Sequence, residues 1–101
     1  MAARVKVLGK DRLSLTCGDN TENFRIDKEL HSFIRNNSKK ITYDVTNDIW
    51  KYKTSHGPNT TLAKRLYVSF KRKQSMTDVG RVQFKNGCRN DLRLTNLTSN
   101  Y

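Results

Sequence analysis

Residues 79–97 read VGRVQFKNGCRNDLRLTNL, and this stretch decides which fold the C-terminal half can adopt. Val82 and Phe84 alternate with polar residues, which is the period of a short β-strand with one face toward a core. Asn86 and Gly87 follow as a turn that stops the strand. The remaining residues, 89–97, hold three leucines and predict a compact loop or helical turn, because they are too few for a long helix.

The segment before this stretch predicts a loop followed by a short helix. TSHGPNT, residues 54–60, contains a Gly-Pro pair that no regular element accommodates, so we expect a loop there. Leu62, Leu66 and Phe70 then follow helical spacing. We expect residues 62–70 to form a strand that runs into a short helix.

The first half of the chain opens with short alternating segments. Residues 4–8 and 12–16 alternate polar and apolar side chains, and a connection containing Gly9 lies between them, which predicts a β-hairpin. Phe24 and Ile26 predict a third short strand.

A helix and a second hairpin are expected next. Asp27 is a good N-cap, because its carboxylate can accept a backbone N–H that is otherwise unpaired. Residues 30, 33 and 34 are apolar and line one helix face, and residues 36–38 end the helix. Residues 41–45 and 49–52 predict two strands around a turn that Asp44 and Asp48 flank, a place where Asp is common without any chemical role. The fold class is therefore α+β, with small antiparallel hairpins and short helices in a single domain over residues 1–101.

The composition excludes several classes of protein. Leu66, Tyr67 and Val68 form the longest uninterrupted aliphatic or aromatic run. A membrane span needs roughly 20 apolar residues and a signal peptide a core of roughly 7–15, so we expect a cytoplasmic protein, or a nuclear one in a eukaryotic host. Cys17 and Cys88 are too few for a zinc site or a disulfide framework, and we expect free, buried thiols. No cofactor and no metal is expected.

The charge is large and uneven along the chain. Twenty Lys and Arg stand against nine Asp and Glu, a net charge of +11. Residues 1–50 carry nine cations and seven acids, whereas residues 51–101 carry eleven cations and two acids. Such an excess repels itself in the folded state, and its simplest explanation is a polyanionic partner. The near-neutral first half predicts an ordinary protein surface, and the basic second half is where we expect a polyanion to dock.

The candidate nucleic-acid-binding residues are the cations of the second half and one amide among them. They are Lys51, Lys53, Lys64, Arg65, Lys71, Arg72, Lys73, Arg81, Gln83, Lys85, Arg89 and Arg93. On strands, Lys51 and Lys53 share one face, and Gln83 shares a face with Arg81 and Lys85. Gln83 is a candidate base reader, because its amide can both donate to and accept from adenine.

Other side chains with chemical potential have a plainer interpretation. His31 lies on the expected helix and His56 in the expected loop, and we assign neither a catalytic or ligand role. The aromatic residues Tyr43, Trp50, Tyr67 and Phe70 can stack on unpaired bases. At strand and helix spacing in so small a domain, we expect them to serve packing instead.

The order of these pieces resembles the HNH homing endonucleases of phages and introns, whose relatives also carry Apetala2-type DNA-binding domains. The resemblance covers residues 5–98 and is most specific in the last twenty. There the family pattern is Val-Asp-His-Ile-Asn-Gly, then Asp-Asn-Arg and a closing Asn-Leu. The positions that match it are Val82, Asn86, Gly87, Asp91, Arg93, Asn96 and Leu97. The resemblance implies a ββα-metal-like C-terminal half.

The positions that carry the family's chemistry are replaced. The resemblance puts the metal ligand and the general base at Gln83 and Phe84, but a phenyl ring cannot accept a proton from water and an amide is a weak ligand for a hard cation. Leu92 stands where the family orients its catalytic His with Asn, and Lys64 stands at the His of its His-Arg-Leu segment. The sequence therefore predicts a nuclease-like scaffold without nuclease activity.

Three functions remain open from the sequence. The first is a catalytically inert HNH-like protein that binds nucleic acid, duplex DNA in preference to RNA, in a phage regulatory or host-takeover role. The second is a small basic interaction protein that docks on an acidic protein surface and inhibits a host enzyme. The third is a component of an RNA-rich particle such as a ribosome, since charge attracts all three partners alike.

Overall fold

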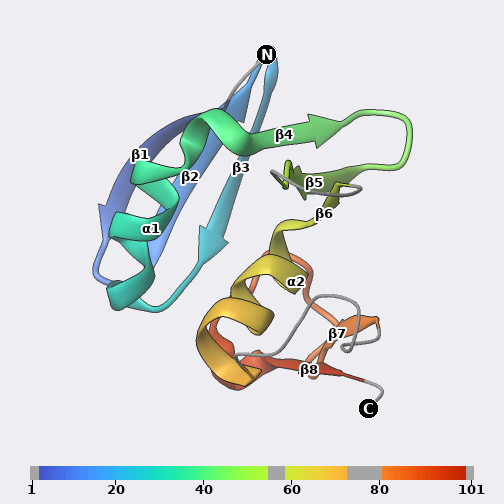
Figure 1. Ribbon diagram of the computed structural model, residues 1–101. Helices are drawn as coiled ribbons and strands as arrows, with labels where there is room; N and C mark the ends of the chain where they lie inside the picture. Colours follow the sequence, from blue (N-terminus) through green and yellow to red (C-terminus); the bar gives the residue numbers. More distant parts are fainter. Residues whose placement is uncertain (1–2, 55–58, 73–80, 100–101) are drawn as a thin grey trace.

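The first three strands form an antiparallel sheet in the order β1–β2–β3 (Figure 1). They are β1 (Arg4–Gly9), β2 (Arg12–Cys17) and β3 (Asn20–Arg25). The computed structural model describes residues 3–54, 59–72 and 81–99, and the side chain of residue 72 is not among its described parts. Leu13 and Leu15 are fully buried on the inner face, as the alternation of the central strand predicts. The expected hairpin and third strand are confirmed, and the third strand is longer than expected.

A short helical segment lies against this sheet (Figure 1). It comprises a 3₁₀ turn (Lys28–Leu30), the helix α1 (His31–Asn36) and a second 3₁₀ turn (Ser38–Lys40). Leu30 and Ile34 are buried in the same core as the inner face of the sheet, so the expected helix face is confirmed.

The second sheet has the order β4–β5–β6. Its strands are β4 (Ile41–Asp44), β5 (Ile49–Tyr52) and β6 (Thr60–Thr61). The expected hairpin is confirmed, and its turn ends at Asp48, whose φ of 54° is left-handed. Two expectations fail here: Val45 is 69% exposed because the strand ends one residue before it, and Thr60 pairs with Tyr52 instead of lying in a loop.

The C-terminal half contains a short helix and a two-stranded sheet. Helix α2 (Leu62–Leu66) continues into a π-helical segment (Tyr67–Arg72), so the strand expected within residues 62–70 is absent and only β6 precedes the helix. Strand β7 (Val82–Phe84) pairs with β8 (Leu97–Ser99), and a 3₁₀ turn (Leu94–Asn96) leads into β8. Strand β8 was not predicted, because three residues are too short to show a period.

One core serves all three sheets, so the expected α+β class with small antiparallel sheets and short helices is confirmed. Its fully buried aliphatic side chains are Leu13, Leu15, Ile26, Leu30, Ile34, Ile41, Leu62, Leu66 and Leu97. They come from both halves of the chain. The described molecule measures 34 × 28 × 24 Å. None of the described helices has the length and apolar character needed to cross a membrane.

Three further side-chain expectations need correction or fall outside the described residues. Phe84 faces inward as expected but is only half-buried, because it lines a cavity. Cys17 is buried as expected, whereas Cys88 is exposed because it lies in the turn after β7. His56, in the expected loop, lies outside the described residues.

The two halves are joined by backbone and carboxylate contacts at the end of β3. The Arg25 N–H donates to the Asn90 carbonyl at 2.8 Å, and the Leu92 N–H donates to the Arg25 carbonyl at 2.7 Å. Asp27 does not cap the helix with its side chain, contrary to expectation. Its carboxylate instead accepts the backbone N–H of Leu94 at 2.7 Å, 67 residues away.

This long-range bond is open to a direct test. Asp27→Ala leaves the Leu94 N–H without its carboxylate, and we expect a loss of about 1.5 kcal/mol in the free energy of unfolding, typical of a hydrogen bond to a charged group. Glu29→Ala removes the same charge from an exposed position in the adjacent 3₁₀ turn and serves as the matched control. Urea titrations of both variants measure the difference. Equal stability of the two variants would contradict a structural role for the Asp27 carboxylate.

Candidate nucleic-acid interface

The outer face of the β1–β2–β3 sheet is polar and basic. Cross-strand register groups its outward side chains into three rows. The rows are Arg4–Thr16–Thr21, Lys6–Ser14–Asn23 and Arg12–Arg25. Six of these eight side chains are exposed, and Ser14 is shielded at the centre by its neighbours on the face.

The acids of the first half lie elsewhere, which leaves this outer face positive. None of the seven occupies an outward position on β1, β2 or β3. Glu22 points inward, where its carboxylate accepts the indole N–H of Trp50 at 2.5 Å. Asp11, in the turn before β2, forms an exposed ion pair with Arg25 at 3.5 Å, and an exposed pair of this kind is weak and salt-screened. The net charge of this half does not show this basic face, because it averages over the two faces of each strand.

Three cations of the predicted set form ion pairs with acids, and the pair of Arg89 with Asp48 is exposed. Lys51 lies 3.2 Å from the Asp44 carboxylate, Arg89 2.9 Å from that of Asp48, and Arg93 2.7 Å from that of Asp91. Arg89 also reinforces the β4–β5 turn by donating to the Asp48 carbonyl at 3.0 Å. The charge available to a partner from these residues is smaller than the sequence suggests.

Two more predicted cations are engaged by neutral groups. The Lys71 ammonium donates to the carbonyls of Leu94 at 2.8 Å and Leu97 at 2.6 Å, which holds the π-helical segment against β8. Burial of this ammonium, and then repulsion by Lys85, lowers the pKa of Lys71. The Arg65 guanidinium lies 5.1 Å from the centre of the Tyr52 ring and 5.9 Å from that of Phe33. Both cations therefore have partners within the fold, and their contact with a polyanion stays a prediction.

The rest of the predicted set falls into two groups. Lys53, Arg81, Gln83 and Lys85 are exposed, and Lys64 is half-exposed. Gln83 points away from the core between Val82 and Phe84, as the alternation of β7 predicts. The side chain of Arg72 and all of Lys73 lie outside the described residues.

A hydrogen-bonded cluster centred on Asp91 fixes the C-terminal loop. Asp91 is only 2% exposed, and its carboxylate accepts from Arg93 Nε at 2.8 Å and from Asn86 Nδ2 at 3.1 Å. The Asn96 side chain donates to the Asp91 carbonyl at 3.0 Å and accepts the Asn86 N–H at 3.0 Å. Gly87, with φ of 74°, takes the left-handed conformation that closes the turn. These side chains satisfy one another, so they act as a scaffold.

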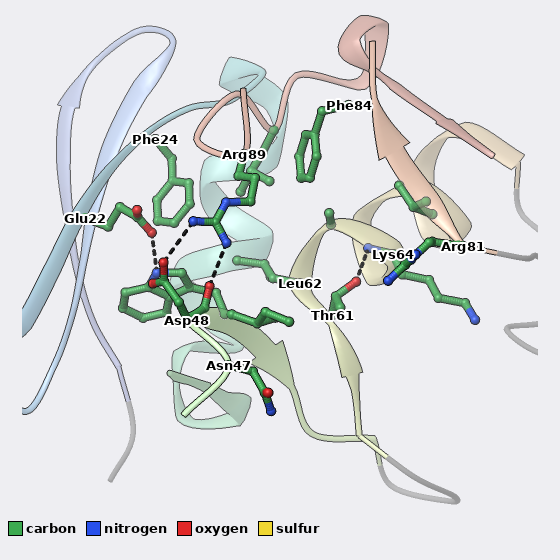
Figure 2. A pocket seen from close by; sticks show the side chains of 15 residues that line it. Glu22, Phe24, Asn47, Asp48, Thr61, Leu62, Lys64, Arg81, Phe84 and Arg89 are labelled. Atoms are coloured by element: carbon green, nitrogen blue, oxygen red, sulfur yellow. Dashed lines mark hydrogen bonds and ion pairs between the residues drawn. The ribbon is translucent and has the colours of Figure 1, made fainter. Parts of the chain in front are cut away.

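Three residues of the predicted set line one cavity, of about 350 Å³, between β3, the β4–β5 hairpin, α2 and β7 (Figure 2). They are Lys64, Arg81 and Arg89. The walls are mostly apolar and include the rings of Phe24, Trp50 and Phe84. Sequence reasoning did not find this cavity, because its residues come from five separate segments.

Two titratable side chains near the cavity, Tyr43 and Asp48, are hydrogen-bonded to each other. The Tyr43 hydroxyl donates to the Asp48 carboxylate, and this bond lowers the pKa of Asp48 and raises that of Tyr43. Within the described part of the chain, no group of three or more His, Cys, Asp or Glu is placed to hold a metal ion.

Comparison of the chain with protein-family models, with curated proteins and with solved structures gives no match. The candidate interface therefore stands on its own geometry and charge.

The Asp91 cluster predicts a pH dependence of stability. Its hydrogen bonds with Arg93 hold the pKa of Asp91 below the ordinary value of 3.8. A carboxyl with a lowered folded-state pKa stabilises the fold above its unfolded pKa, and this contribution is lost as pH falls through the folded pKa. Asp91→Asn should cost about 2 kcal/mol at pH 6, less than a fully buried pair because the Arg93 side chain is 32% exposed.

The measurement compares urea unfolding of wild type and Asp91→Asn between pH 6 and pH 2. We expect the gap between the two proteins to stay constant down to about pH 4 and to narrow below it, since protonation removes the same charge in the wild type. A gap that is independent of pH would contradict an ionised Asp91 in the folded protein.

Proposed function

We propose that this protein binds nucleic acid, duplex DNA in preference to RNA, through the outer face of the β1–β2–β3 sheet, and that it has no nuclease activity. The observation that carries the proposal is that the alternation of side chains along the strands places cations together on the outer face of the sheet. Arg4, Lys6, Arg12 and Arg25 share one face with hydroxyl and amide side chains, and no acid occupies an outward position on these three strands.

The dimensions and chemistry of this face suit the major groove of B-DNA. Three strands at 4.7–4.9 Å spacing are about 10 Å wide, and the groove is about 12 Å wide. The cations are arranged to neutralise phosphates, which dominate affinity. Thr16 and Asn23 between them can donate to and accept from base edges. The major groove of A-form RNA is too narrow and deep for a sheet, which favours DNA.

The C-terminal cations have a secondary role in this proposal. Lys53, Lys64, Arg81 and Lys85 are not in an ion pair with any described acid, and we assign them auxiliary phosphate contacts. Gln83 remains a candidate base reader beside Arg81 and Lys85, because its amide is exposed on β7.

The resemblance to HNH homing endonucleases supports the part of the proposal that denies nuclease activity. Asn86, Asp91, Arg93 and Asn96, which match the family pattern, bond to one another, and this favours a structural role for them. Phe84 stands at the position of the general base and has no proton acceptor. We propose that residues 51–101 are a degenerate HNH-like unit and that the protein acts as a phage or mobile-element regulator.

Salt-dependent DNA binding tests the sheet face. The triple variant Arg4→Ala/Lys6→Ala/Arg12→Ala should bind duplexes of many sequences more weakly. It should also reduce the slope of log K against log salt by up to about 0.9 per lost phosphate contact. The matched control is Arg35→Ala/Lys39→Ala/Lys40→Ala, which removes three exposed cations from the helical side of the molecule. Fluorescence anisotropy between about 50 and 200 mM salt measures both slopes.

The outcomes separate the three functions that the sequence left open. A reduced slope for the sheet variant alone supports the proposal. Equal slopes for the two variants would remove the sheet face as the interface. Tighter binding to structured RNA than to duplex DNA would favour an RNA-rich particle, and weak binding to both would favour an acidic protein partner.

The absence of nuclease activity has its own assay. Purified protein incubated with supercoiled plasmid should leave it intact with magnesium, manganese or zinc, because the chain has Gln83 and Phe84 at the metal and base positions. Nicking that copurifies with the protein and disappears in His56→Ala would overturn the inert assignment.

A further inference from the structure

The cavity between the sheets has the composition of a ligand site. Its volume of about 350 Å³ falls in the range of small-molecule pockets. Phe24 and Leu92 are among its lining residues. Phe84 and Trp50, whose side chain is 7% exposed, contribute ring surface. Rings in a cavity of this size offer stacking surface to a planar aromatic group.

The position of the Trp50 ring is fixed from two sides. Its plane is at 84° to that of Phe24, with ring centres 5.8 Å apart, an edge-to-face pair. Its indole N–H donates to the Glu22 carboxylate at 2.5 Å. A ring held in this way is preorganised, so little conformational entropy is lost when a ligand stacks on it.

Charge is distributed unequally around the cavity. Figure 2 shows Arg89 bonded to Asp48 on the same side as Glu22, whereas Lys64 and Arg81 lie together on the other side. Neither Lys64 nor Arg81 forms an ion pair with a described acid. Two cations without acidic partners at one side of an aromatic cavity provide a site for an anionic group, and a phosphate accepts hydrogen bonds from both side chains.

We propose that this cavity binds a nucleobase carrying a phosphate, with the base against Trp50 and Phe84 and the phosphate at Lys64 and Arg81. A base paired inside a duplex cannot reach such a cavity. The ligand is therefore a free mononucleotide or an unpaired nucleotide of a strand. The inference goes beyond duplex binding. Of the residues assigned to duplex binding, only the auxiliary contacts Lys64 and Arg81 also line the cavity, and the outer face of the sheet contributes no side chain to it.

Trp50 provides the measurement, since it is the only tryptophan of the chain. Titration with AMP should change the Trp50 emission in a saturable way, because the base stacks on its ring. The double variant Lys64→Ala/Arg81→Ala should raise the apparent Kd for AMP at least tenfold. Lys39→Ala/Lys40→Ala removes the same charge away from the cavity and should leave the Kd within twofold. Circular dichroism confirms that both variants are folded.

Two probes distinguish the sources of the ligand. Saturation by AMP identifies a free nucleotide as sufficient, whereas a response only to single-stranded oligodeoxyadenylate identifies an unpaired base of a strand. Either response supports the site. No response to AMP or to the oligonucleotide would overturn it, as would the same emission change with inorganic phosphate alone.

The test is independent of the duplex assay. Arg4→Ala/Lys6→Ala/Arg12→Ala should keep the wild-type response to AMP even where duplex binding is lost. A wild type that binds AMP but no duplex would refute the proposed function and leave the cavity site standing. Duplex binding without any nucleotide response would refute the cavity site alone.

Discussion

The Asp27 carboxylate and the backbone bonds beside it hold the two halves of this small protein together. Asp27 reaches from the end of β3 to the Leu94 N–H, and Asp91 lies beside Arg25, where the loop adds a backbone bridge to β3. The Asp27 carboxylate is thereby engaged by a backbone N–H, whereas the Asp91 carboxylate pairs with Arg93 within the C-terminal loop. Closure of the two halves depends on the first of these bonds and on the backbone bonds next to it.

The alternation of strand side chains then distributes that charge. A period of two residues places Lys6 on one face and Val5 on the other, so a segment that is nearly neutral along the chain becomes basic on one face. In the C-terminal half the opposite occurs, because Arg93, Lys71 and Arg65 are engaged by an acid, by carbonyls and by rings. Charge per segment is therefore a poor measure of charge per surface.

The outer sheet face and the cavity suit different parts of a nucleic acid. The face is open and about as wide as a major groove, which suits paired DNA. The cavity is enclosed by Trp50 and Phe84 and suits a base that has left the stack. Because the two sites share no side chain, separate variants can assign each property to its own surface.

The sequence alone determined the local elements: the hairpin periods of β1 and β2, the helix face of Leu30 and Ile34, and the turn at Gly87. Each rests on neighbours within a few residues, where propensity and period act directly. Only the tertiary structure decided that Asp27 bonds to Leu94, that Lys71 is anchored at β8, that β8 exists, and that Trp50 meets Lys64 and Arg81 around one cavity. These depend on segments far apart in the chain, whose juxtaposition is set by burial of the common core and leaves no periodic trace in the sequence.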